Sequence, residues 1–520
     1  AHTKEEIFQK ACALAQIPMK KVQSMQIMKQ SVDARKKDAL SYTYTVQLVV
    51  DEHQKIRKNH AHVQELKPVV YQIPGRKELL SEKREQMAVI GAGPAGLFAA
   101  YLLAQRGYCP HIYERGRAVE ERQQDVEDFW NGGALDPESN VQFGEGGAGT
   151  FSDGKLNTLV KDKFGRSRYV LETFVKFGAP EDILYVAKPH VGTDVLRDVI
   201  SRMRQEIIRL GGTFHFSTKV TDLHIEDGRI SKIELNHKEW KDVSGVILAI
   251  GHSARDTFEM LYERKVPMMA KSFAVGMRVE HPQDMINESQ YGEGYPEEVP
   301  TASYKLTHQC KGTGRGIYSF CMCPGGYVVN SSSEKGRLCV NGMSYHDRAG
   351  HNSNTALITT VTPDDFPSDS PLAGLEFQRK YEELAYKIGN GKIPVQLFGD
   401  FLKNQMSTKL GNVTPSIKGE WQFANLHECL PDYVCASLEE GMRAFGHKIK
   451  GYDAEDTVFS GVETRTSSPL RMERNKQFES NIQGLFPCGE GAGYAGGITS
   501  AAMDGIKTAE AIAEKILTQN

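Results

Sequence analysis

One glycine pattern constrains the fold of this chain more than any other feature of its sequence. Residues 87–90 are apolar, Gly91, Gly93 and Gly96 follow in the spacing G-x-G-x-x-G, and small and apolar residues then lead to Gly107. This order predicts a short buried strand, a tight turn and a helix. Gly91 permits the turn, Gly93 lets a phosphate approach the backbone, and Gly96 lets helix and strand pack closely. The pattern therefore predicts a dinucleotide site at the amino end of the helix.

A second predicted strand ends at Glu114, roughly 20 residues beyond the first glycine, where a carboxylate accepts hydrogen bonds from ribose hydroxyls. A carboxylate there disfavours a phosphate on that ribose. Pro94 suits the first turn of the helix, because its missing N–H would have no partner there in any case. A chance glycine turn is the alternative, although strand, turn, helix, strand and acid follow one another in order. From this unit we predict cofactor contacts by Gly91, Gly93, Pro94, Ala95, Gly96, Glu114 and Arg115.

A second glycine-rich segment lies near the carboxyl end. Residues 484–488 are predicted as a strand, and GEGAGYAGG precedes a long helix that begins near Thr499 or Ser500. The segment resembles the C-terminal signature of FAD-dependent oxidoreductases, in which an acid binds the ribityl chain and a helix N-terminus faces the flavin pyrimidine. A helix dipole there stabilises the anionic reduced flavin. A loop that caps an ordinary surface helix is the alternative. The resemblance implies cofactor contacts by Gly489, Glu490, Gly497 and Ile498.

A strand that ends in Ala-Ile-Gly, at 246–251, also resembles part of such flavoproteins. It follows two paired strands that we predict around a turn at Asp227-Gly228. In these proteins the end of such a strand approaches the dinucleotide, and an earlier strand makes backbone contacts to adenine. The resemblance implies contacts by Val220, Ala249 and Gly251.

The segment GEGGAGTFSDGKLNT, at 144–158, is the third glycine-rich stretch. It has the position of the loop that passes the pyrophosphate and the flavin ring in FAD oxidoreductases with a single Rossmann unit. Glycine there lets backbone amides reach phosphate and ring without an intervening side chain. A slack surface loop is the alternative. The cofactor interpretation implies contacts by Gly146, Gly147, Gly149, Ser152 and Lys155.

These segments, with KPHVGTDVL at 188–196 and SFCMCPGGYVVNSS at 319–332, resemble a bacterial family of uncharacterised FAD-dependent dehydrogenases. The chain is more distantly similar to geranylgeranyl-reductase and electron-transfer flavoprotein dehydrogenase-like enzymes. The resemblance implies bound FAD and oxidoreductase chemistry, but no particular substrate. We find no second strand-GxGxxG-helix unit for a dedicated nicotinamide domain. Transiently bound NAD(P)H, the substrate and a protein partner all remain possible electron donors.

We predict an α/β fold with a Rossmann-like FAD/NAD(P)-binding domain, an inserted α+β cap domain and a small N-terminal α+β domain. The predicted N-terminal module, 1–85, has a helix at 4–15, a strand at 41–50 and a linker QIPGRKELLSEKREQ at its end. The FAD-binding domain is predicted in two parts, 86–270 and 456–520, and the substrate or cap domain occupies 271–455.

Composition narrows the classes of partner. The net charge is only -3, from 63 Lys and Arg against 66 Asp and Glu, so a nucleic-acid or membrane surface is not favoured as the main partner. No apolar run long enough to span a bilayer and no secretory pattern are found, so we expect a cytoplasmic protein without a membrane partner. The expected partner is a small-molecule substrate. The 9 cysteines are predicted as reduced thiols. The oligomeric state is left open. The basic segment at 20–37 is interpreted as a solvated helix or loop face, with an RNA-binding patch as the alternative.

The predicted cap holds the remaining candidates for chemistry. Cys321 and Cys323 are two apart on a predicted strand and would share one face, so they are either structural or a redox pair. No ligand spacing typical of zinc is present, and we expect no metal site. The possible acids and bases, of which none is assigned as catalytic, are Arg278, His281, Tyr345, His346 and Arg348.

The sequence thus predicts hydride transfer between bound FAD and an organic substrate under the cap. Two alternatives stay open: a flavin-dependent RNA-modifying enzyme that uses the N-terminal module, and a non-enzymatic redox sensor or scaffold that uses Cys321 and Cys323.

Overall fold

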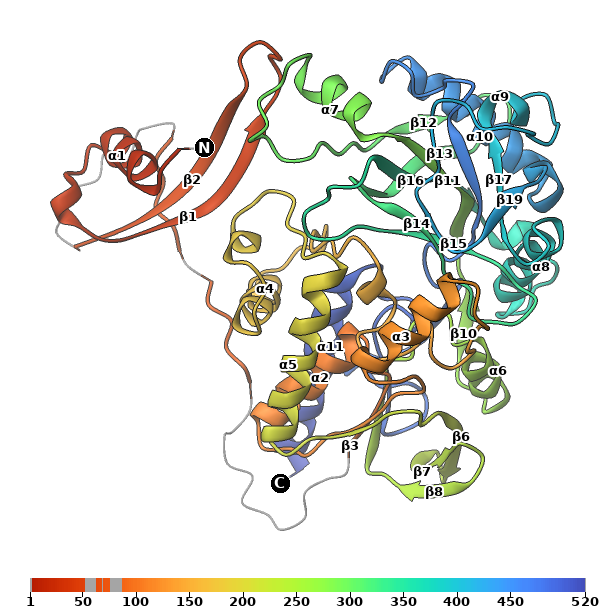
Figure 1. The fold of residues 1–520 in the computed structure, drawn as a ribbon. Helices are drawn as coiled ribbons and strands as arrows, with labels where there is room; N and C mark the ends of the chain where they lie inside the picture. The colour runs from red at the N-terminus through yellow and green to blue at the C-terminus, as the bar shows by residue number, and fades with distance from the viewer. Residues whose placement is uncertain (1, 52–61, 68, 75–86, 520) are drawn as a thin grey trace.

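A five-stranded parallel sheet carries the glycine fingerprint (Figure 1). The structure is a computed structural model that describes residues 2–51, 62–67, 69–74 and 87–519. The strand order is β22-β9-β3-β4-β5, and all neighbours are parallel. Both β3 and β9 are buried throughout, as their continuous apolar sequences require. The strands are β3 (Met87–Ile90), β4 (His111–Tyr113), β5 (Thr213–His215), β9 (Gly245–Leu248) and β22 (Leu485–Pro487).

Helices α2 (Pro94–Gln105), α5 (Thr193–Arg209) and α11 (Ile498–Gln519) lie side by side along this sheet (Figure 1). The closest approach is between α2 and α11, where a Cβ on Gly505 would overlap the backbone carbonyl of Ala95. Small residues on both helices therefore let their backbones touch. Three further helices belong to this part: α3 (Val119–Trp130), α4 (Arg166–Lys176) and α6 (Arg255–Glu263).

A small antiparallel sheet joins the parallel one, with β6 (Val220–Glu226), β7 (Arg229–Leu235) and β8 (Glu239–Asp242) in that order. The predicted turn at Asp227-Gly228 is confirmed, because both residues have positive φ, 48° and 76°, and they connect β6 to β7.

A seven-stranded mixed sheet dominates the rest of the chain (Figure 1). Its order is β12-β13-β16-β11-β20-β17-β19. These seven strands are β11 (Phe273–Pro282), β12 (Thr307–Gln309), β13 (Gly316–Cys323), β16 (Asn352–Val361), β17 (Ile393–Leu397), β19 (Trp421–Phe423) and β20 (Val458–Glu463). Since β20 belongs to this sheet, the sheet crosses the predicted domain boundary at 455. The boundaries themselves stay predictions.

Two smaller sheets and four helices complete this part. Strands β14 (Tyr327–Asn330), β15 (Val340–Met343) and β18 (Ile417–Lys418) form one sheet, and β10 (Met268–Ala270) pairs with β21 (Leu470–Met472). The helices are α7 (Gln283–Tyr291), α8 (Ala373–Ile388), α9 (Phe398–Phe401) and α10 (Asp432–Gly446). Buried apolar side chains form separate clusters around the parallel sheet and around the seven-stranded sheet.

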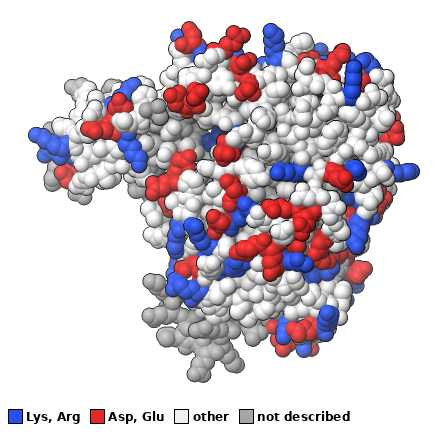
Figure 2. All heavy atoms as spheres, in the orientation of Figure 1, with Lys and Arg blue, Asp and Glu red and all other residues white. Residues whose placement is uncertain are grey.

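The N-terminal unit projects from the body (Figure 1). Helix α1 (Lys4–Ala15) and strand β2 (Ser41–Val50) have the predicted bounds. The interpretation of the basic segment as a helix or loop face is wrong, because most of it forms β1 (Val22–Asp33), which pairs with β2 along its length. Acidic and basic groups are interspersed on the face shown in Figure 2, the projecting unit included. Most of the predicted linker lies outside the described residues.

Candidate functional site

A cavity of about 340 Å³ opens where the carboxyl ends of β3, β4 and β9 face the seven-stranded sheet. The carboxyl ends of parallel strands are the usual ligand-binding edge of such sheets. All but three of the predicted cofactor contacts line this cavity. Those that line it are Gly91, Gly93, Pro94, Ala95, Glu114, Arg115, Gly147, Gly149, Ser152, Lys155, Val220, Ala249, Gly251, Glu490, Gly497 and Ile498.

Gly96, Gly146 and Gly489 do not line the cavity, and their glycine is explained by packing. A Cβ on Gly96 would overlap the Gly91 carbonyl oxygen. On Gly146 it would collide with the Thr150 side chain, and on Gly489 it would lie 2.7 Å from the Ala95 Cβ. Glycine at these three positions allows the segments around the cavity to pack closely against one another.

The glycine positions in the cavity wall form a cradle of bare backbone. A Cβ on Gly251 or Gly497 would meet nothing within 4 Å, and one on Gly93 would meet only the Gly147 Cα, at 3.8 Å. Gly93 also precedes α2 without any side chain to cap the helix, so first-turn N–H groups of α2 have no capping side chain. Open space beside uncapped amides fits the phosphates of a dinucleotide.

The stretch from Gly144 to Thr158 is not a slack loop. The Gly146 N–H donates to the Ala92 carbonyl at 2.8 Å, which ties the stretch to the fingerprint turn. Behind it lies Arg122, whose guanidinium is fully buried and donates to the carbonyls of Asn140, Val141, Gly144, Glu145 and Gly147 at 2.7–3.3 Å. Burial lowers the pKa of Arg122 to about 10, so this side chain remains a cation at neutral pH. The glycine loop is therefore held in place by one buried arginine.

Our sequence reasoning missed Arg122, although a signal was present. Val119, Arg122 and Val126 lie three and four residues apart on α3, and all three are buried. An arginine on the apolar face of an otherwise charged helix indicates that its guanidinium is buried and bonded to buried acceptors.

Glu114 is buried at the end of β4 and is held by three backbone amides. Its Oε2 accepts from the Ala92 N–H at 2.8 Å, and its Oε1 accepts from Gly116 and Gly144 at 2.9 and 3.0 Å. A carboxylate offers about four acceptor positions, so a hydroxyl donor still finds a place on this side chain.

At the opposite wall, His252 and Glu490 lie together, with Nδ1 and Oε1 3.4 Å apart. The His252 Nε2 atom is buried and has no hydrogen-bond partner among the described residues. An unpaired buried nitrogen in a cavity wall indicates a missing polar ligand. His252 was not predicted as a site residue.

The cap side of the cavity is polar and charged. Asp153 is buried and pairs with Lys155 at 3.2 Å and with Arg348 at 3.1 Å. Burial opposes ionisation, but the two cations outweigh it and lower the pKa of Asp153. Asn341, from β15, and Arg465, two residues after β20, complete this wall.

Arg465 is fixed by a buried ion-pair triad. Glu382 of α8 accepts from Arg465 at 2.8 and 2.9 Å and from Arg255 at 2.7 and 2.9 Å. Arg255 begins α6 beside the parallel sheet, so the triad joins the two halves of the molecule at the cavity. Neither arginine was singled out from the sequence.

The possible acids and bases named from the sequence are dispersed rather than gathered in the cavity. His281 is buried against the Tyr452 carbonyl, and His346 stacks on His190. Tyr345 packs edge-on against Tyr327. None of these residues lines the cavity wall, and no catalytic base follows from them.

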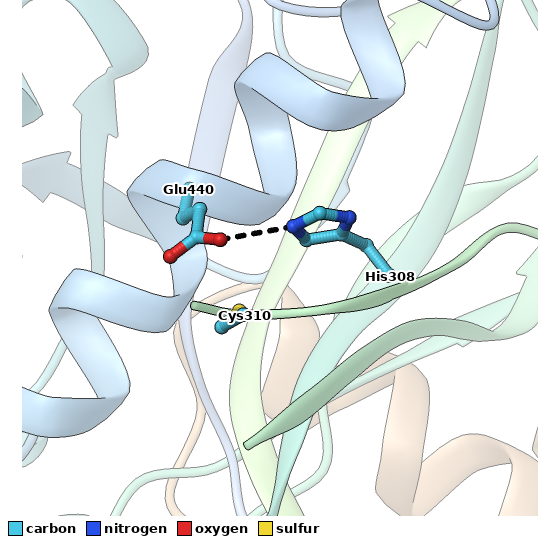
Figure 3. A group of neighbouring side chains, drawn as sticks. All are labelled: His308, Cys310 and Glu440. Carbon is cyan, nitrogen blue, oxygen red and sulfur yellow. Dashed lines mark hydrogen bonds and ion pairs between the residues drawn. The ribbon is translucent and has the colours of Figure 1, made fainter. Parts of the chain in front are cut away.

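Three ligand-type side chains gather elsewhere, on the edge of the seven-stranded sheet (Figure 3). His308 donates to Glu440 at 3.0 Å, and the same carboxylate accepts from the N–H groups of Lys311 and Gly312. Cys310 is buried and its Sγ lies 3.7 Å from the Ser437 carbonyl. These bonds fasten the turn after β12 to α10 and account for the cluster without a metal. The absence of a metal site stays a prediction.

A parallel sheet with a glycine cradle at the carboxyl ends of its strands defines a Rossmann-like dinucleotide-binding fold. Residues 272–466 match the family described as FAD-dependent protein, C-terminal domain-like, and 89–120 match the NAD(P)-binding Rossmann-like domain. Residues 1–49 match a domain of unknown function, DUF8436.

A relative from Clostridium beijerinckii, described only as an uncharacterized protein, is 50% identical over 511 residues, which cover 97% of this chain and 95% of the relative. The chain therefore belongs to the family of uncharacterised FAD-dependent proteins that its motifs resemble, and FAD is its cofactor.

Similar solved structures include quinol fumarate reductase of E. coli, with 14% identity, coverage of 84% of this chain and 71% of that one, and a TM-score of 0.36. Another is glycerol-3-phosphate dehydrogenase of Bacillus halodurans complexed with FAD, with 12% identity, coverage of 84% and 66%, and a TM-score of 0.37. Among the described residues, none of the helices combines the length and the apolar character needed to cross a membrane.

Proposed function

We propose that this protein is an oxidoreductase that transfers hydride between bound FAD and an organic substrate in the same cavity. The observation that carries the proposal is that one cavity is lined both by the glycine cradle and by polar residues of the cap. FAD supplies the redox chemistry, because its ring system accepts and gives up a hydride. The protein supplies binding, orientation and charge.

The proposed FAD contacts follow the geometry of the cradle. Gly93 and the amino end of α2 would hold phosphates, and Glu114 would accept from ribose hydroxyls. The amino end of α11, at Gly497 and Ile498, would place its positive dipole end where the ring gains negative charge on reduction. His252 would donate from its unpaired Nε2 or accept there, depending on its tautomer.

The proposed substrate position lies against the cap. Phe320, Asn341 and Arg465 line this wall, together with Lys155 from the glycine-rich stretch. An aromatic face with cations and an amide suits a substrate that has both apolar and polar parts. Transiently bound NAD(P)H is the proposed electron donor.

The test is the visible absorption of the purified protein during anaerobic titration with NADPH. A flavin band that bleaches supports both the cofactor and a nicotinamide-driven reductase. A band that persists under NADPH would refute the proposed donor, and a protein without any flavin band would refute the oxidoreductase.

Gly93→Val is the matched variant, because the fold has room for its Cβ whereas the cradle would be filled. We expect a folded protein with the circular dichroism of the wild type and little bound flavin. Gly316→Val is the control, since Gly316 lies on β13 outside the cavity wall and a Cβ there makes an ordinary contact with Gln309. Full flavin loading of Gly93→Val would show that the cofactor lies elsewhere.

A further inference from the structure

Two cysteines of β13 occupy unequal positions at the cap side of the cavity. Cys321 lines the cavity and is partly exposed, whereas Cys323 is buried. Their strand is irregular at this point: Phe320 pairs with Ala356 and Cys323 with Asn354, so two residues of β13 lie opposite one of β16. Such a bulge redirects a side chain out of the regular alternation.

The backbone of Cys321 confirms this departure from regular strand geometry. Its φ is 44°, in the left-handed region that a residue with a Cβ rarely adopts. Arg278 donates to the Cys321 carbonyl at 2.9 Å, and the Lys155 ammonium donates to the carbonyl of Met322. Two cations therefore hold the bulge. Strained backbone that its surroundings stabilise is a common property of reactive positions.

The two cysteines are close in space and have different protonation preferences. The Cys323 Sγ lies 3.3 Å from the Cys321 carbonyl oxygen. A hydrogen bond from the Cys323 thiol lowers the pKa of Cys321 well below its ordinary value, and the Lys155 and Arg278 cations lower it further. The pKa of Cys323 is raised, because its proton is shared with Cys321 and because it is buried. These shifts favour a thiolate at Cys321 and a thiol at Cys323.

Other buried cysteines of the cap differ from this pair. Cys339 is completely buried, and burial raises its pKa to about 11. Burial likewise raises the pKa of Cys435 to about 12. A thiolate is the reactive form of cysteine, so the raised pKa disfavours reaction at Cys339 and Cys435, whereas the lowered pKa favours Cys321 as the nucleophile of the cap.

We propose that Cys321 and Cys323 are a redox-active dithiol that exchanges an electron pair with FAD, and that the substrate is a dithiol or disulfide compound that reaches Cys321 through the cavity. The inference rests on the proposed function for the place of FAD. It assigns a substrate class, which the proposed function alone does not.

The electrons and atoms of the internal step balance. The Cys321 thiolate and the Cys323 thiol form one S–S bond, and the S–H bond of Cys323 breaks. Two electrons and this one proton pass to oxidised FAD, which gives its anionic two-electron-reduced form. An external dithiol then reduces the Cys321–Cys323 disulfide by thiol–disulfide exchange, leaves as a disulfide and releases its second proton to solvent, which restores the thiolate and the thiol. In the reverse direction, which the NAD(P)H donor of the proposed function would drive, the same pair reduces an external disulfide and one proton is taken up from solvent.

The first test concerns the pair alone and needs no activity. The full-length protein is treated anaerobically with the thiol oxidant diamide, its remaining thiols are blocked with iodoacetamide, and its peptides are analysed by mass spectrometry. We expect a disulfide between Cys321 and Cys323 that dithiothreitol reverses. Cys109→Ser, which alters a partly exposed cysteine outside the cavity, should behave like the wild type. Two free thiols after diamide would refute the dithiol.

A second readout separates a redox pair from two structural cysteines. The rate of Cys321 alkylation is measured against pH in the wild type and in Cys323→Ala. We expect the midpoint to rise in the variant, because alanine offers no proton to the Cys321 thiolate, and the resolving sulfur is lost as well. An unchanged midpoint would contradict the assignment of Cys323 as the group that stabilises the thiolate.

The coupling to FAD is tested by absorption. The dithiol form of the protein, with bound FAD, is kept under anaerobic conditions without an added electron donor. The loss of the flavin absorption band is compared with the amount of disulfide that forms. We expect one disulfide for each flavin reduced, and neither change in Cys321→Ser. A disulfide without any flavin response under a series of redox buffers would refute the coupling. A protein that forms the disulfide but holds no flavin would refute the proposed function and leave the dithiol standing, so the two failures are distinguishable.

Discussion

Glu382→Gln tests the ion-pair triad that joins the two halves of the molecule. The Glu382 side chain is fully buried and accepts from Arg255, from Arg465 and, at 2.7 Å, from the Thr464 hydroxyl. Glutamine keeps the shape but removes the charge, and its amide N–H groups would face two guanidinium groups that are themselves donors. Arg255 and Arg465 would then stay buried with one carboxylate nearby, that of the partly exposed Glu334, which contacts Arg255.

The expected cost follows from that loss. Removing one partner of a buried ion pair costs roughly 3–5 kcal/mol, because the other charge stays buried without compensation. The neighbouring residue provides a matched control, since Glu383 pairs with Arg337 at 2.7 Å on the surface and is half exposed. Glu383→Gln should cost about 0–1 kcal/mol.

The assay is urea unfolding, followed by circular dichroism, together with the flavin content of each variant. We expect Glu382→Gln to lose flavin as well as stability, because Arg465 lines the cavity. If both variants unfold within about 1 kcal/mol of each other, the triad does not stabilise the protein as its geometry implies.

The difference in stability between wild type and Glu382→Gln should change with pH in a definite direction. Burial alone would raise the pKa of Glu382, but Arg255 and Arg465 outweigh it and hold the pKa well below the ordinary 4.5. A carboxyl group with a lowered pKa contributes stability above its unfolded pKa and loses it as the pH falls toward the folded pKa. The difference in free energy of unfolding between wild type and Glu382→Gln should therefore be full at pH 7 and shrink below pH 4.5.

Two further predictions concern buried polar groups. Arg122→Met should remove the donor that holds the glycine stretch, lower the free energy of unfolding in urea by about 3 kcal/mol or more and lower the flavin content. Arg117→Met, which alters the partly exposed Arg117–Asp125 pair, should cost less than about 1 kcal/mol. Equal effects of the two substitutions would refute the anchoring role of Arg122. Burial raises the pKa of Glu280 to about 7, so between pH 5 and 8 the free energy of unfolding of the wild type should fall by about 3 kcal/mol relative to Glu280→Gln, and parallel pH profiles would contradict this.

The sequence was informative where the determinants are local. The fingerprint turn needs glycine at Gly91 because a Cβ there would collide with Ala249, and helix α1 has its predicted bounds because Thr3 and Glu6 form a capping box. Such features depend on residues close in the chain, so spacing alone indicates them.

The sequence failed where distant segments decide the outcome. The basic segment that includes β1 was interpreted from its charges, but pairing with β2 determines its structure. Cys321 could be named as a candidate, whereas its bulge and its neighbours Lys155 and Arg278 arise only when β13 packs against β16 and the glycine stretch. No local sequence pattern indicates which distant segments of the chain will come into contact.

The position of β22 and α11 also has a consequence for biosynthesis. These elements complete the parallel sheet beside β9 and place Gly497 and Ile498 in the cavity, yet they are translated after every strand of the seven-stranded sheet. Domains generally fold from the amino end during synthesis, so the cap sheet is translated before the cradle is whole. Cofactor loading then requires that synthesis has passed α11: a chain interrupted before β22 would present its cysteine pair without the whole of the proposed flavin site.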